Sequence, residues 1–212
     1  MSSAEWFSLL GTVYTIRGGT QEEVKTRIRI ACGKFHQIWP MLRHQGSSLK
    51  QRIRLFNAVV GRSLLWGCES WTLSVAEKKK MQAVERNMLR KFAAPRRATG
   101  EDWITWVRRA TRIATERAGR AGVKSWVQQH LCAKWQWAGH IARMGSYRPE
   151  SWAFKTTFWR AMDWKANNGP GSAYYHLRPL RARPGRWRRW EDEVGRYCLS
   201  MVFEDWRKLV TQ

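Results

Sequence analysis

The sequence predicts a mainly α-helical protein, a multi-helix bundle with a short β segment at its N-terminus and an extended basic linker. In several segments apolar residues recur at every third or fourth position, which is the spacing of one helix face. Three of these segments begin with Ser or Thr followed three residues later by Glu or Gln, the pattern of a capping box. β-prone residues, in contrast, are concentrated before Gly18.

Residues 1–19 are the one stretch where strands are expected. The turn signal Gly18-Gly19 follows a β-prone set made up of Trp6, Phe7, Leu9, Leu10, Val13, Tyr14 and Ile16. We expect a short strand or a hairpin in this stretch.

The clearest helix is expected from Thr20 to Leu42. Thr20 and Glu23 have the spacing of a capping box. The apolar stripe that follows contains Val24, Ile28, Ala31, Phe35 and Ile38. Pro40 is expected to end or kink this helix, because proline has no backbone N–H to donate.

The segment from Ser48 to Trp71 is expected to form a core helix that runs into a turn. Ser48 and Gln51 mark its start as a capping box. Its apolar stripe contains Leu49, Ile53, Phe56, Val60 and Leu64. Phe56 lies in the middle of this stripe and is expected in the core, and Gly67 is expected to break the helix between two tryptophans.

Further helices are expected along the chain. One starts at the capping box of Ser74 and Glu77 and runs to about Phe92, with an inward face of Met81, Val84, Met88 and Phe92. The next covers about 99–117 with the apolar set Trp103, Trp106, Val107, Ala110 and Ile113. A third covers about 123–144 with Val127, Leu131, Trp135, Ala138 and Ile141, and a last one follows at 187–209.

These elements suggest a domain organisation. We expect a hairpin remnant at 1–19, a helical bundle at 20–97, a C-terminal helical region at 98–145, a loop-rich basic linker at 146–185 and a C-terminal helix at 186–212. The linker is expected because Asn, Gly and Pro gather at 167–172 and because residues 178–189 hold six arginines, two prolines and no acid.

Charge indicates the class of partner. The formal net charge is +23, from 39 Lys and Arg against 16 Asp and Glu, which favours nucleic acid. An anionic membrane surface is the second choice, although no run of 18 apolar residues is present to span a bilayer. The N-terminus lacks the pattern of a secretory signal, so we expect an intracellular protein with reduced cysteines. Most of the 15 tryptophans are expected at helix interfaces, and those flanked by Arg or Lys are alternatives for base stacking.

The candidate nucleic-acid contacts are basic residues that lie off the apolar stripes or in acid-poor segments. A run of such residues on a helix is also compatible with a merely solvated face, and both interpretations stay open. The imbalance of charge favours phosphate contacts, which are weakly specific for sequence. The candidates are Lys50, Arg52, Arg54, Lys78, Lys79, Lys80, Arg86, Arg90, Lys91, Arg96, Arg97, His140, Arg143, Arg181, Arg183, Arg186, Arg188 and Arg189.

Five stretches of the sequence form an ordered set of motifs: Phe7-Ser8-Leu9-Leu10-Gly11; Glu23, Arg27, Ile28, Ala31 and Phe35; LLWGCESW at 64–71; WQWAGHIARM at 135–144; and Arg183-Pro184 followed by Arg189-Trp190-Glu191-Asp192. Together they resemble the region downstream of the active site in reverse transcriptases of LINE-type (non-LTR) retrotransposons. In the first, Leu9 stands where the family usually has an aromatic residue. In the last, Ala182 replaces a glycine and two extra residues intervene. The order and spacing of the five carry the resemblance.

The resemblance implies the thumb and C-terminal segment of an RNA-directed DNA polymerase, binding RNA or an RNA/DNA template–primer, with a nuclear location. Polymerisation needs carboxylates that hold two divalent metals, and no Asp-Asp pair occurs in this sequence. In the family this pair precedes the first of the five motifs. We therefore expect no polymerase activity from this chain alone, no cofactor and no small-molecule substrate. The alternative is a domesticated or decayed fragment that acts as a protein-interaction module or has no function.

Two smaller features are weaker candidates for sites. His130, Cys132 and His140 suggest zinc, but a structural zinc site takes four ligands in close pairs, and His130 and Cys132 are expected on different helix faces. We expect His140 to be packed or to contact phosphate. The acidic pair Glu101-Asp102 is interpreted as helix-end and surface charge rather than as a catalytic site.

Overall fold

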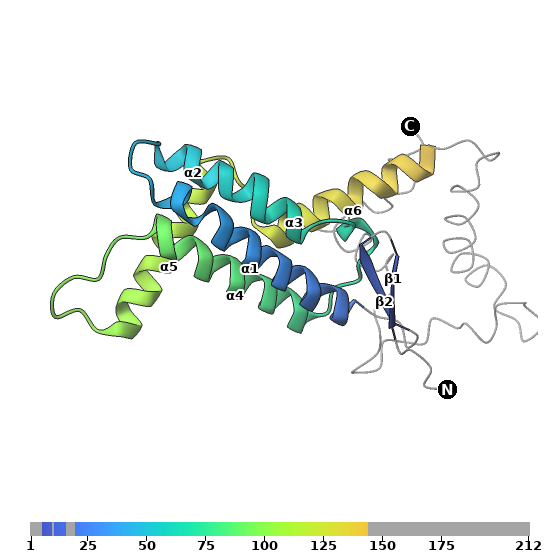
Figure 1. Cartoon of the computed structure of the whole chain (residues 1–212), viewed down its shortest axis with the longest axis horizontal. Helices are drawn as coiled ribbons and strands as arrows, with labels where there is room; N and C mark the ends of the chain where they lie inside the picture. Colours follow the sequence, from blue (N-terminus) through green and yellow to red (C-terminus); the bar gives the residue numbers. More distant parts are fainter. Residues whose placement is uncertain (1–5, 10, 16–19, 144–212) are drawn as a thin grey trace, which may run out of the picture. The chain divides into compact units, whose positions relative to one another are not determined.

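The structure is a computed structural model of the chain, and it describes residues 6–9, 11–15 and 20–143. The described part is mainly helical, which confirms the predicted fold class (Figure 1). Residue contacts divide the chain into two compact units, Met1–Cys132 and Ala133–Gln212. The predicted boundary between residues 97 and 98 falls inside the first unit. The predicted linker at 146–185 and the helix at 186–212 lie outside the described residues.

The N-terminal segment is a hairpin of strands β1 (Trp6–Leu9) and β2 (Thr12–Thr15), as expected. The strands are antiparallel, with Trp6 opposite Thr15 and Leu9 opposite Thr12. Gly11 turns the chain between them with a φ of 79°, a backbone conformation that glycine adopts without steric cost.

Helix α1 (Gln21–Arg43) holds this hairpin through a buried ion pair. Glu23 accepts the β2 N–H of Val13 at 2.6 Å and the Nε–H of Arg27 at 2.7 Å. Arg27 donates in turn to the carbonyl of Gly11. Since a buried charge needs partners, these contacts explain how both side chains tolerate burial.

The same contacts overturn the capping box predicted at the start of α1. Thr20 is the N-cap residue, but its side chain caps no helix N–H. Its hydroxyl lies 3.1 Å from both the Thr72 carbonyl and the Glu77 carboxylate. Glu23 is committed to Val13 and Arg27, so tertiary contacts replace the local cap. The helix continues past Pro40 to Arg43.

The predicted core helix is present as three consecutive pieces, α2 (Leu49–Phe56), the π-helical turn η1 (Asn57–Gly61) and α3 (Arg62–Leu64). The capping box of Ser48 and Gln51 is confirmed. Phe56 is 1% exposed, and its ring centroid lies 5.5 Å from that of Phe92 and 5.7 Å from that of Trp126. The π turn contains Gly61, at which a Cβ atom would lie 3.1 Å from Trp126 Nε1.

The turn after α3 is also as predicted. Gly67 has a φ of 67°, in the left-handed region, and the short 3-10 helix η2 (Cys68–Ser70) follows it. Trp71 is buried and stacks on His130 with ring centroids 6.1 Å apart. The His130 Nδ1 lies 2.9 Å from the Cys68 carbonyl, so this nitrogen carries the proton and donates it.

Helices α4 (Val75–Ala93), α5 (Trp103–Arg120) and α6 (Trp126–Arg143) complete the described chain. The capping box of Ser74 and Glu77 opens α4, and Asp102 caps α5 by accepting the N–H groups of Ile104 and Thr105. The helix-end role predicted for Asp102 is thus confirmed. Arg90 of α4 bonds to Thr111 of α5 at 3.1 Å, which ties the two helices together.

The inward face predicted for α5 needs correction. Its buried residues are Ala110, Ala114 and Ala118, whose small side chains let α5 approach its neighbours closely. Trp103, predicted to face inward, is 58% exposed because it lies in the first turn of the helix, ahead of this alanine stripe.

Glu85 of α4 is a buried acid on a helix whose other charged residues are mostly exposed. Its Oε1 accepts the Trp126 N–H at 3.0 Å and so holds the first residue of α6. Burial raises the pKa of Glu85 to about 7, while the Trp126 N–H and the nearby Arg86 charge act in the opposite direction.

This raised pKa predicts a pH-dependent stability. The contribution of Glu85 is fully present below the unfolded pKa of 4.5 and is lost as pH rises through about 7, because ionising the buried carboxyl is unfavourable. The wild type should therefore lose stability between pH 5 and pH 8, and Glu85→Gln, which cannot ionise, should not. The free energy of unfolding of the variant minus that of the wild type should rise by up to about 3 kcal/mol over this range. Urea unfolding across this range measures the difference. Glu22→Gln, at an exposed position, is the control. Stability curves of the wild type and of Glu85→Gln that stay parallel across the range would contradict the assignment.

Candidate nucleic-acid interface

Helix α4 carries six of the 18 predicted contact residues. Met81, Met88 and Leu89 turn inward into the core, so basic residues at other positions of the helix turn outward. Lys79, Lys80, Arg86 and Lys91 are exposed, and Lys78 and Arg90 are half-buried. Lys91 also lies over the Phe35 ring, 5.8 Å from its centroid.

Helix α5 adds a second set of arginines that the sequence did not single out. Arg108, Arg112 and Arg120 are exposed on the side of α5 opposite its buried alanines. The four-residue spacing of Arg108 and Arg112 is the available signal, since such residues share a helix face. The tryptophans of this helix favour its interpretation as a core helix, and this interpretation does not predict its arginines as contact residues.

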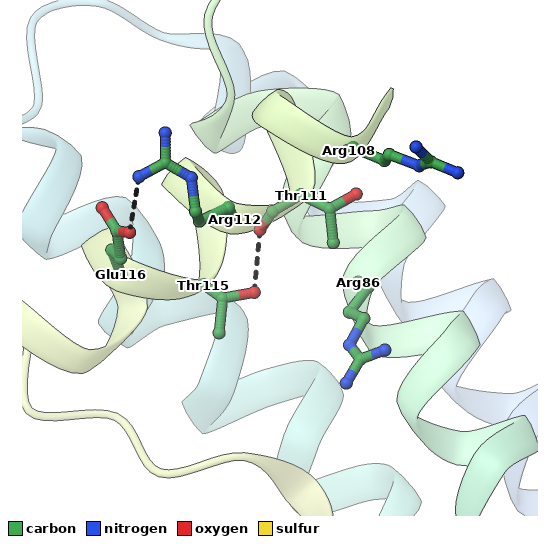
Figure 2. Close-up of a pocket in the computed structure, with 6 residues that line it drawn as sticks. All are labelled: Arg86, Arg108, Thr111, Arg112, Thr115 and Glu116. Carbon is green, nitrogen blue, oxygen red and sulfur yellow. Dashed lines mark hydrogen bonds and ion pairs between the residues drawn. The ribbon is translucent and has the colours of Figure 1, made fainter. Parts of the chain in front are cut away.

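These two sets meet at an open pocket of about 550 Å³ between α4 and α5. Arg86 of α4 and Arg108 of α5 lie on one side of it, and the Arg112 guanidinium turns toward Glu116 at 3.2 Å (Figure 2). The remaining lining residues are Thr111 and Thr115. Glu116 is the one acid in the lining, and it also lies 3.7 Å from Arg120.

Hydrogen bonding leaves two of the three guanidinium groups in the pocket, those of Arg86 and Arg108, as free donors. The Thr111 hydroxyl donates to the Val107 carbonyl at 2.6 Å, and the Thr115 hydroxyl donates to the Thr111 carbonyl at 2.9 Å. Within the part of the chain that the structure describes, no hydrogen bond or ion pair engages the guanidinium of Arg86 or of Arg108. An anion in this pocket would therefore meet two guanidiniums that no described acid pairs with directly, and guanidiniums are the groups best suited to phosphate oxygens.

Two predicted contact residues on α2 have structural partners. Arg52 is half-buried and donates to the Leu42 carbonyl at 2.9 Å, near the end of α1. Arg54 donates to the Ala121 carbonyl at 3.2 Å, directly after α5. Arg117 does the same for Ala93, the last residue of α4, at 2.6 Å. Cations at helix C-termini satisfy carbonyls that have no partner within the helix, so these arginines stabilise helix ends.

Lys50 is exposed and has no such partner among the described residues.

The loop between α4 and α5 is basic and ordered by one carboxylate. Glu101 accepts two hydrogen bonds from Arg109, at 2.8 and 2.7 Å, and one from the Ala98 N–H. The Arg109 hydrogen bonds are the main reason that the pKa of Glu101 falls to about 2. Arg96 and Arg97 are exposed in this loop, as expected of contact residues.

The other predicted residues lie on α6 or beyond the described chain. His140 is exposed, and its ring lies 5.5 Å from that of Trp137, so it is not packed into the core. Arg143 ends α6. Arg181, Arg183, Arg186, Arg188 and Arg189 lie outside the described residues.

Metal binding and membrane crossing each need features that the described residues lack. No group of three or more His, Cys, Asp or Glu side chains there is placed to hold a metal ion. None of the helices in that part of the chain has the length and apolar character needed to cross a bilayer.

Comparison with known proteins returns no relative: no protein-family model, curated protein or solved structure matches this chain.

Proposed function

We propose that this chain is a nucleic-acid-binding fragment of a LINE-type reverse transcriptase, and that it binds RNA or an RNA/DNA template–primer through phosphate contacts. One observation carries the binding proposal: Arg86 and Arg108 line an open pocket between α4 and α5 without a hydrogen-bonded or ion-paired acid among the described residues. Further basic residues are exposed on α4 and in the following loop. Such a surface neutralises phosphates and reads little sequence.

The motif positions support the family part of the proposal. Glu23 and Arg27, which match one motif, form the buried pair that holds the hairpin. In the LLWGCESW motif, Gly67 adopts a left-handed conformation while Leu64, Cys68 and Trp71 are buried. These motif residues thus occupy positions that constrain the backbone and the core, as expected of residues that define a family pattern.

We further propose that this chain does not polymerise by itself. Its aspartates, at 102, 163, 192 and 205, are never adjacent, so the sequence offers no pair to hold two metals. Asp102 is occupied as the cap of α5. Within this proposal the catalytic carboxylates come from a palm domain, and an intracellular, nuclear location follows from the work of a retroelement enzyme.

The pocket is tested by removing its two unpaired guanidiniums. Arg86→Gln with Arg108→Gln should weaken binding of a short oligonucleotide about tenfold near 0.1 M salt and lower the salt slope by roughly 1.5 to 2. The control is Lys25→Gln with Arg29→Gln, which removes the same charge from the exposed face of α1. Fluorescence anisotropy gives the affinities, and circular dichroism checks the fold. Equal losses in both variants would mean that net charge alone, not the pocket, drives binding.

A further inference from the structure

Trp103 is a large aromatic side chain left open to solvent at the start of α5. It is 58% exposed, and the adjacent Ile104 is 59% exposed. Tryptophan is enriched at interfaces with partners, because its large apolar ring also carries a polar N–H.

The indole is held in place rather than loose. Asp102 caps the helix and fixes the backbone of the first turn through Ile104 and Thr105. The Trp103 ring lies 4.9 Å from that of Trp106. Trp106 is anchored in turn, because its Nε1–H donates to the Pro95 carbonyl at 3.2 Å. A partner that stacks on Trp103 therefore needs to order little of the protein, which favours binding.

The charges around Trp103 favour an anionic partner. Both nearby acids are committed, Glu101 to Arg109 and Asp102 to the helix cap. Arg96 and Arg97 are exposed in the preceding loop. Trp106, which lies against Trp103, donates to the carbonyl of Pro95, so Arg96 and Arg97 directly follow the loop residue held at these rings. An aromatic platform close to arginines is the combination that binds single-stranded nucleic acid.

We propose that Trp103 is a base-stacking platform, and that the surface of α5 and the preceding loop binds single-stranded RNA or DNA. A base stacks on the Trp103 indole while phosphates of the same strand meet Arg96 and Arg97 in the preceding loop. Bases inside a duplex are stacked on one another and cannot reach the indole, so this site selects single strands. The inference rests on the proposed nucleic-acid binding and adds the class of ligand.

The test compares strands with and without bases. The probes are labelled oligothymidylate of about twelve nucleotides and an abasic oligomer of the same length. The unmodified full chain should bind the thymidylate about tenfold more tightly, a preference that stacking of one base is sufficient to produce. Trp103→Leu should abolish this preference and leave abasic binding unchanged. Trp66→Leu, at a position 60% exposed outside α4 and α5, should keep it.

The outcomes separate the two proposals. If the unmodified chain binds both oligomers equally, or if Trp66→Leu loses the preference as Trp103→Leu does, the stacking platform is refuted while phosphate binding stands. If Trp103→Leu weakens abasic binding as much as thymidylate binding, its role is structural and the platform is also refuted. If neither oligomer binds, the proposed function itself fails.

Discussion

Phe56→Ala is expected to lower the free energy of unfolding by about 3–5 kcal/mol, the usual cost of truncating a fully buried phenylalanine. The side chain is 1% exposed and lies among three other aromatic rings, with centroids 6.1 Å away for Phe35, 5.5 Å for Phe92 and 5.7 Å for Trp126. These rings come from α1, α4 and α6, so a cavity at Phe56 loosens several helices together. Because small domains are stable by only about 5–15 kcal/mol, such a loss threatens the fold.

Denaturant unfolding followed by circular dichroism measures this change. Trp66→Ala removes a larger side chain that is 60% exposed, and it should cost under about 0.5 kcal/mol. A loss below about 1 kcal/mol for Phe56→Ala would show that the aromatic cluster does not form the core of the first unit.

The features that the sequence predicted correctly are local ones. The capping boxes at Ser48 and Ser74 depend on residues three positions apart, and both are present. Gly67 adopts its left-handed conformation in the turn after α3, and this conformation depends on the local backbone alone. The position of Phe56 in the core followed from the helical period of its stripe, which survives the π turn that follows it.

The features that it missed depend on residues far apart in the chain. Glu23 would cap α1 if the helix stood alone, but β2 and Arg27 take its oxygens. Glu85 resembles a surface acid in the sequence because its partner, the N–H of Trp126, is 41 residues away. For the same reason Arg52 and Arg54 resemble phosphate contacts, although each donates to a carbonyl at the end of another helix.

The candidate interface has one feature that the sequence predicts and one that it does not. The basic character of α4 is evident from composition, and most of its lysines and arginines are indeed exposed. The pocket is not evident, because it forms only where α5 packs on α4 and brings Arg108 to the same opening as Arg86. The helical spacing of Trp103 predicts a core position, but the side chain is exposed. Periodicity shows which residues share a helix face, and it does not show where along the helix the contact with neighbouring helices ends.

The central claim, binding through phosphates, is tested most directly by a salt titration of the unmodified chain with a short oligonucleotide. Each neutralised phosphate releases counterions, so log K should fall linearly with log salt. With about six contacts, from the pocket, the loop and α4, the affinity should drop by roughly 10³ between 50 and 200 mM salt. The account predicts this steep line. No binding at 50 mM salt, or an affinity that stays flat across the series, would contradict it and favour a protein-interaction module instead.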